Sequence, residues 1–198
     1  MGAEHSQCPE TFILQKPGIK LVIPSTPYDA KGLMKSAIRD NNPVVYFFHK
    51  RLMALEGEVP EEEYVIPLGA ADIKREGTDV TVVATGYMVK MALEVAKNLE
   101  GKISVELIDP RSLEPLDIKT ILQSVKKTGR VVIVDEDTER CGPAAEMGMQ
   151  IMEKGFDYLD APIKRVCAAN YPIAGGYMEE LCLPQPVRIR AAIEEVMA

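Results

Sequence analysis

Histidine, the side chain most often used in acid–base catalysis, is rare in this sequence. The 198 residues include only two histidines, His5 and His49. Three successive acids, Asp135-Glu136-Asp137, end an apolar run that is typical of a central strand. Open α/β folds place ligand sites at the carboxyl ends of strands, where paired carboxylates can act as acid and base. Three acids in a solvated loop would explain the run equally well.

Other common catalytic arrangements are not supported. The sequence has no Gly-x-Ser-x-Gly turn, so a hydrolase triad is not indicated. Thr85-Gly86 at a strand-to-helix junction could present backbone N–H groups to a phosphate, but the glycine spacing of a nucleotide loop is missing and a simple tight turn is the alternative. Without a C-x-x-C pair the cysteines make no zinc signature, and we expect free, mostly buried thiols. They are Cys8, Cys141, Cys167 and Cys182.

Apolar segments of strand length alternate with longer segments of helical period, which predicts an α/β fold with an open, mostly parallel sheet flanked by helices. We expect strands at residues 20–24, 44–48, 79–85, 103–108, 130–135 and 163–168. We expect helices at residues 28–39, 87–99, 117–127, 142–153 and 187–197. The continuous apolarity of residues 44–48 predicts a strand buried on both faces.

Two helices carry more detailed expectations. Thr26 or Ser25 can cap the helix at 28–39, and Pro27 suits its first turn. We expect its buried side to consist of Leu33, Met34, Ala37 and Ile38. The terminal helix can present one apolar face made of Val187, Ile189, Ala192, Ile193 and Val196.

Composition excludes two broad classes of function. A net charge of −7 without clustered Lys and Arg argues against a nucleic-acid binder. No apolar run approaches the ~20 residues that span a bilayer, so we expect a soluble protein and no membrane partner. Residues 1–7 have neither a basic nor an apolar leader segment, and a cytoplasmic location is expected.

Ordered motifs along the chain indicate a family. The sequence resembles the beta subunit of the thiamine diphosphate-dependent decarboxylating component of 2-oxo-acid dehydrogenase complexes, within the transketolase family. The resemblance extends over essentially the whole chain. The matching segments are residues 5–7 (HSQ), 24–33 (PSTPYDAKGL), 37–43 (AIRDNNP), 49–52 (HKRL), 108–117 (IDPRSLEPLD), 127–130 (KTGR) and 156–162 (FDYLDAP).

This resemblance implies a domain organisation. Residues 1–56 would be the C-terminal part of a thiamine pyrimidine-binding domain, residues 57–64 a linker, and residues 65–198 a transketolase C-terminal-type domain. The family's cofactor-activating glutamate precedes the histidine loop, which corresponds to residues 5–7 here, and so falls outside this chain. The motif that binds the diphosphate and Mg²⁺ belongs to the alpha subunit. The isolated chain is therefore expected to be inactive.

The resemblance also assigns residues. His5 matches the family histidine that faces the thiazolium end of the cofactor and serves proton transfer and acyl transfer to lipoamide. Ala37, Asp40 and Asn42 match positions around a structural potassium ion, although Asp40 and Asn42 could simply cap the helix and turn the chain. His49 has no obvious acid or metal partner in the sequence, and we expect it to be structural.

Three functions stay open. The first is part of the beta subunit of a 2-oxo-acid or acetoin dehydrogenase, acting with an alpha subunit, a lipoyl acyltransferase core and a second beta subunit. Pyruvate, branched-chain 2-oxo acids and acetoin are all possible substrates. The second is a noncatalytic scaffold that retains the C-terminal domain. The third is a fragment of a transketolase-like carbohydrate enzyme.

Overall fold

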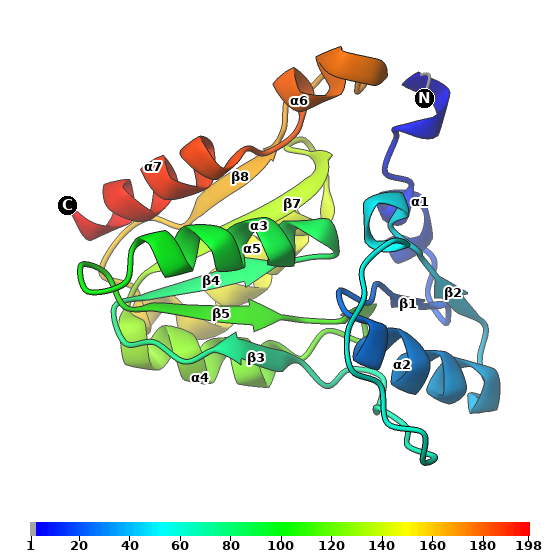
Figure 1. Ribbon diagram of the computed structural model, residues 1–198. Coiled ribbons are helices and arrows are strands. Elements are labelled where there is room, and N and C mark those ends of the chain that lie inside the picture. The colour runs from blue at the N-terminus through cyan, green and yellow to red at the C-terminus, as the bar shows by residue number, and fades with distance from the viewer. Residues whose placement is uncertain (1–2) are drawn as a thin grey trace.

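The computed structural model describes residues 3–198, apart from the Tyr177 side chain. Its main feature is a five-stranded sheet in the order β3-β5-β4-β7-β8 (Figure 1). All neighbouring pairs are parallel except β3 with β5, which is antiparallel. The open, mostly parallel sheet expected from the sequence is thus confirmed. The strands are β3 (Asp72–Arg75), β4 (Val80–Ala84), β5 (Val105–Asp109), β7 (Val131–Thr138) and β8 (Lys164–Ala168).

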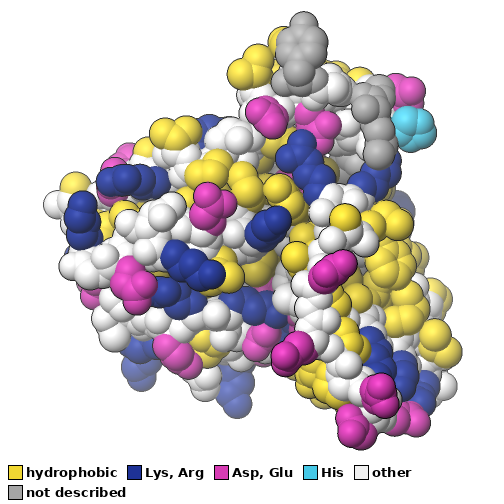
Figure 2. All heavy atoms as spheres, viewed as in Figure 1, with side chains coloured by type: hydrophobic (Ala, Val, Ile, Leu, Met, Phe, Trp, Pro, Cys, Tyr) yellow, Lys and Arg dark blue, Asp and Glu magenta, His cyan; other side chains and the backbone are white. Residues whose placement is uncertain are grey.

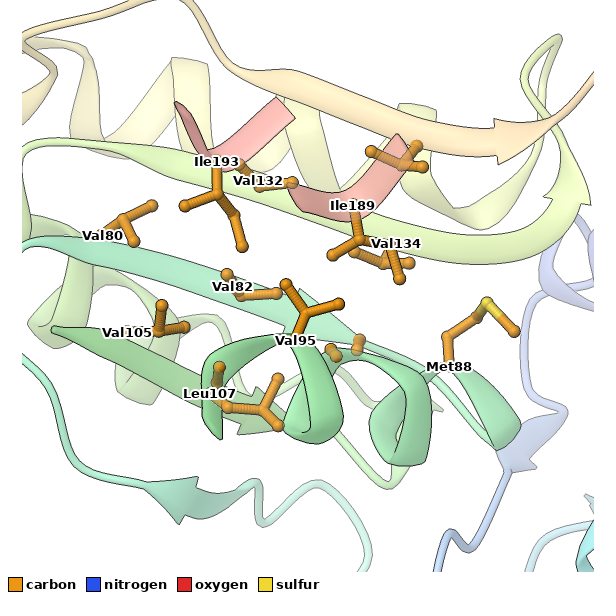
Figure 3. Close-up of a cluster of buried hydrophobic side chains, with 14 of the residues drawn as sticks. Val80, Val82, Met88, Val95, Val105, Leu107, Val132, Val134, Ile189 and Ile193 are labelled. Atoms are coloured by element: carbon orange, nitrogen blue, oxygen red, sulfur yellow. The ribbon is translucent and has the colours of Figure 1, made fainter. Parts of the chain in front are cut away.

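Helices cover both faces of this sheet. Val82 packs in one buried cluster with side chains of α3 and α7, whereas Val83 packs in another with side chains of α4 and α5. Successive strand residues point to opposite faces, so one apolar strand serves both layers. Figure 3 shows the first cluster, in which Ile189 and Ile193 of α7 lie against the strand valines. The helices are α3 (Tyr87–Asn98), α4 (Ile118–Thr128), α5 (Pro143–Gly155) and α7 (Pro186–Met197).

A smaller sheet has the order β2-β1-β6. Strands β1 (Lys20–Val22) and β2 (Val44–Tyr46) are parallel and are connected through α2 (Pro27–Arg39). Strand β6 (Ser112–Glu114) adds to β1 in the antiparallel direction. Because β6 follows β5 in the chain, the two sheets are joined by a strand as well as by the segment 57–64, which has neither helix nor strand.

Short helical turns complete the described chain. They lie mainly at the end of the molecule where the N-terminal segment approaches α6 (Figure 1). They are η1 (Ala3–His5), α1 (Glu10–Leu14), η2 (Lys50–Leu52), η3 (Phe156–Tyr158), η4 (Gly176–Met178) and α6 (Glu179–Cys182).

The predicted start of α2 is confirmed. Thr26 is its N-cap, and its hydroxyl accepts a hydrogen bond from the Asp29 backbone N–H at 3.1 Å. Pro27 is the first helical residue. Of the four residues expected on the buried side of α2, Leu33 is buried and Met34 and Ala37 are half-buried, but the prediction was wrong for Ile38, which is 76% exposed. In the apolar face of α7, Val187 is 71% exposed.

Strand β2 is only half-buried, so the expectation of burial on both faces was also wrong. It forms the edge of the small sheet, with β1 as its neighbour. The three acids 135–137 correct a further expectation. They continue strand β7 and are all buried, and therefore do not form a solvated loop.

A buried ionic cluster joins α2 to the strands of the larger sheet. Lys74 Nζ lies 2.6 Å from Asp29 Oδ2, 2.7 Å from Asp72 Oδ2 and 3.7 Å from Asp109 Oδ2. Arg111 Nη1 donates to Asp29 Oδ1 at 3.0 Å. The side chains of Asp29 and Asp109 are 1% and 0% exposed, so each depends on these cations for compensation of its charge.

Candidate functional site

A cavity with a volume of 310 Å³ lies where the ends of β1, β2 and β7 meet the N-terminal segment. This position agrees with the general placement of ligand sites outside the carboxyl ends of parallel strands. Its wall combines apolar residues such as Ile23 and Phe47 with ionisable ones. The ionisable residues that line the cavity are His5, Cys8, Glu10, His49, Lys50, Arg51, Glu136 and Glu179.

His5 lines this cavity and is exposed. The loop that carries it is held at two points. Lys50 Nζ donates to the His5 carbonyl at 3.0 Å. Gln7 exchanges two hydrogen bonds with the backbone of Ile173, at 3.1 and 3.4 Å. The catalytic role of His5 stays a prediction, which its position in the cavity wall supports.

His49 lines the same cavity and has an acidic partner. Its Nε2 contacts Oε2 of Glu136, and its Nδ1 accepts a hydrogen bond from the Arg51 backbone N–H at 3.2 Å. The ring also stacks on Tyr87, with centroids 5.3 Å apart. Our expectation that His49 lacks an acid partner was therefore wrong. No local spacing signals this pair, because β7 comes much later in the chain.

Glu10 is a cavity residue that the sequence reasoning missed. Burial, followed by the charges of the nearby acids Asp135, Asp137 and Glu136, raises the pKa of its carboxyl to about 8. Within residues 3–198 its Oε2 has no hydrogen-bond partner. At neutral pH the group is mostly a neutral acid, which can donate a hydrogen bond.

Asp135 and Asp137 fix the backbone around this region. Asp135 accepts hydrogen bonds from the Thr85 hydroxyl at 3.1 Å and from the Ala144 N–H at 3.2 Å, and its burial raises its pKa to about 6. Asp137 accepts from the Thr11 hydroxyl at 2.8 Å. Both carboxylates therefore hold neighbouring elements together, and the Thr85 N–H donates to the Val134 carbonyl at 3.3 Å.

The four cysteines are free, as expected. Cys167 and Cys182 are buried, Cys8 is half-buried and Cys141 is exposed, so burial holds for only part of the set. Burial, followed by the nearby acids, raises the pKa of the Cys8 thiol well above its ordinary value. A thiol in this environment is a poor nucleophile.

The predicted potassium ligands lie at the end of α2. Asp40 Oδ2 is 2.5 Å from Lys20 Nζ, and Asp40 Oδ1 accepts hydrogen bonds from the Asn42 N–H and side-chain amide at 2.8 and 3.0 Å. The Ala37 carbonyl accepts the Asp40 N–H at 3.4 Å. The carboxylate already has a cationic partner, which favours the alternative in which Asp40 and Asn42 cap and turn the chain. The potassium site stays a prediction.

The chain is similar to known protein families. Residues 69–189, more than half of the chain, match the family described as the transketolase C-terminal domain. The chain belongs to this family. Residues 1–56 match the transketolase pyrimidine-binding domain, and most of the cavity wall comes from this match, with Glu136, Glu179 and Leu183 from the other.

Curated relatives of this transketolase-family chain are beta subunits. Three from Bacillus subtilis (strain 168) are the beta subunits of acetoin:2,6-dichlorophenolindophenol oxidoreductase (48% identical), 2-oxoisovalerate dehydrogenase (44%) and the pyruvate dehydrogenase E1 component (48%). The matches cover 98%, 97% and 91% of this chain. They cover only 58%, 60% and 56% of the relatives, so the chain spans little more than half of their length.

A solved structure supports the fold. A split-gene transketolase, described as an inactive beta4 tetramer, aligns with a TM-score of 0.83 over 98% of this chain and 63% of its own. At 24% identity this likeness shows the fold alone. No helix among residues 3–198 has the length and apolarity needed to cross a membrane.

Proposed function

We propose that this chain is part of the beta subunit of a thiamine diphosphate-dependent 2-oxo-acid or acetoin dehydrogenase. The observation that carries the proposal is the cavity wall, which combines His5 from the pyrimidine-binding match with Glu136 and Glu179 from the second part of the chain. The named relatives supply the reaction class, oxidation of acetoin or a 2-oxo acid.

The residues present fit one end of the cofactor. The cavity is at the lower limit of the roughly 300–1,000 Å³ that small-molecule sites occupy, and it offers an apolar wall beside a histidine. Within residues 3–198 no three His, Cys, Asp or Glu side chains gather as a metal site. The chain can therefore contact the reacting end of thiamine diphosphate, while the diphosphate and Mg²⁺ need ligands from another subunit.

When bound, thiamine diphosphate supplies a nucleophilic carbon and an electron sink. His5 can accept or donate a proton at the substrate oxygen, since an imidazole offers both an acceptor and a donor nitrogen. Glu10, with its raised pKa, keeps a proton inside the cavity at the same pH. The chain thus contributes His5 and Glu10, two side chains that can hold or transfer protons beside the reacting atoms.

Partners are implied by the surface of the first 56 residues. Figure 2 shows hydrophobic side chains gathered over this part of the molecule. Phe12, Ile38, Phe48 and Met53 are each more than half exposed. Apolar surface of this kind marks interaction sites. We propose that an alpha subunit and the preceding part of the beta subunit cover this apolar surface. A second beta subunit and a lipoyl acyltransferase core are further proposed partners. The proposed location is the cytoplasm.

A noncatalytic scaffold is the second candidate. It is favoured by the match of residues 69–189 to the transketolase C-terminal domain, which is the part that such a scaffold would retain. The two functions differ in whether the assembled protein turns over a substrate.

The test is to co-express the chain with an alpha partner and the upstream half of the beta subunit. Dye reduction is measured with thiamine diphosphate, Mg²⁺ and, in turn, pyruvate, acetoin and branched-chain 2-oxo acids. Turnover of one substrate class is expected. An assembled, cofactor-loaded complex that is inactive with all of them would support the scaffold instead.

His5→Ala in that enzyme should depress lipoamide acylation more than cofactor affinity, because imidazole acts on the reacting groups. Equal losses of both would contradict the assigned role.

A further inference from the structure

The histidine loop is connected to strand β7 of the C-terminal domain by a continuous series of contacts. The series begins at Glu136, whose side chain is 11% exposed, and passes through His49 to the helical turn η2. From η2 it reaches the His5 carbonyl through Lys50. It therefore joins the larger sheet to the residue that we place beside the reacting atoms.

Both ring nitrogens of His49 are used in this series. The Arg51 backbone N–H donates to Nδ1, so a neutral ring carries its proton on Nε2, the atom that contacts Glu136. Stacking on Tyr87 fixes the plane of the ring. His49 thus has no nitrogen left for a ligand, although it lines the cavity, and its geometry suits holding neighbouring residues in place.

The element that His49 holds is η2. His49 is the N-cap of this turn, so its bond with the Arg51 N–H sets where the turn begins. Lys50, the first residue of the turn, reaches back to the His5 carbonyl. Arg51 also pairs with Glu179 at 3.0 Å and lies over the Tyr87 ring, which ties η2 to the C-terminal domain a second time.

We propose that Glu136 and His49 are positioning residues, which fix the place of His5 through η2 and Lys50. This inference rests on the proposed function for the role of His5 and adds to it that the C-terminal domain sets the geometry of the histidine loop. Misplacement of a reacting group by about 1 Å can lower a rate by about 100-fold, so such support matters for catalysis.

The second anchor of the loop, between Gln7 and Ile173, does not depend on His49. Loss of the Glu136–His49 pair should therefore loosen the loop without releasing it. The expected defect is a change in position and mobility of His5, with the fold of the larger sheet unchanged.

The first experiment measures amide hydrogen exchange in the 198-residue chain. Glu136→Leu and His49→Leu should each speed exchange in residues 3–9 by about tenfold and leave β4 unchanged. His49→Gln and Glu136→Gln should restore slow exchange, since each amide can replace the lost donor or acceptor. Glu139→Leu is the matched control, because Glu139 lies just beyond β7 and pairs with Arg165 instead. Unchanged exchange in Glu136→Leu would overturn the proposal.

Nitrogen NMR of the two imidazoles gives a second readout, and a His5→Asn variant assigns them. His49 should show the proton on Nε2 in the wild-type chain. A proton on Nδ1 instead would overturn the proposed geometry.

Activity of the assembled enzyme separates this inference from the proposed function. Glu136→Leu should lower kcat for lipoamide acylation about tenfold with little change in KM, and Glu139→Leu should match wild type. An equal fall in both variants would overturn the positioning role. If the wild-type enzyme is inactive with every substrate, the proposed function fails, while the exchange and NMR results still decide whether the pair holds the loop.

Discussion

Replacing Lys74 with methionine should destabilise the protein strongly at neutral pH. The substitution keeps the length of the side chain and removes the ammonium group that lies 2.6 Å from Asp29 and 2.7 Å from Asp72. Asp29 would keep Arg111 as a partner. Asp109, with a side chain that is 0% exposed, would lose the cation 3.7 Å away. Breaking a buried pair from one side costs roughly 3–5 kcal/mol.

The loss should depend on pH. Burial raises the pKa of Asp109 to about 6, and Lys74 limits that rise. For an acid with a raised pKa in the folded state, stability falls as the pH rises through that pKa, because only the unfolded state ionises freely. A rise of this pKa from about 6 to 7 when Lys74 is lost costs about 1.4 kcal/mol at pH 7, and a rise beyond 7 adds nothing more at that pH. At pH 5 folded Asp109 is mostly protonated, and the deficit should be smaller.

Urea unfolding at pH 5 and pH 7 measures this loss of stability. At pH 7 the same loss should lower the melting temperature by roughly 10 °C. Adding Asp109→Asn should recover part of the loss at pH 7. Lys164→Met is the control, because Lys164 pairs with the well-exposed Glu195 and should cost less than about 1 kcal/mol. A deficit below about 1 kcal/mol at pH 7, or one equally large at pH 5, would refute the reasoning.

Three further predictions concern single positions. Gly77→Ala should lower the free energy of unfolding by about 3 kcal/mol, because a Cβ would lie 2.2 Å from the Val105 backbone carbon. Gly148→Ala in α5 should raise the free energy of unfolding by about 0.5–1 kcal/mol. Urea unfolding that shows a change of the same sign for both variants would contradict this prediction. Thr26→Ala should cost about 1 kcal/mol through loss of the α2 cap, and Thr26→Ser should recover most of it in the same assay. Melting in KCl and in NaCl should coincide, because Asp40 already pairs with an ammonium group; a rise specific to potassium, lost in Asp40→Ala, would support the predicted ion site.

Local patterns predicted the larger sheet well. The apolar runs at residues 79–85 and 130–135 became strands β4 and β7, and the cap at Thr26 started α2. Strands β3 and β6 were not predicted. Each is short and exists because it pairs with a distant strand, β3 with β5 and β6 with β1. A strand of three or four residues has too little periodicity to be recognised by itself.

The candidate site was also only partly predictable from the sequence. The histidine loop and the domain matches were recognisable from ordered motifs, and His5 does line the cavity. The partner of His49 and the raised pKa of Glu10 were not predictable, because both depend on how the fold packs β7 and its acids against the N-terminal segment.

The sequence by itself determined the α/β class, the order of most helices and strands, and the family. These follow from apolar periodicity, caps and short motifs, which act between residues close in the chain. Only the tertiary structure decided which acids are buried, which helix ends stay exposed and how β7 meets the histidine loop. Those properties depend on contacts between distant segments, and the electrostatic environment of a carboxyl or an imidazole is set by the groups that packing places around it.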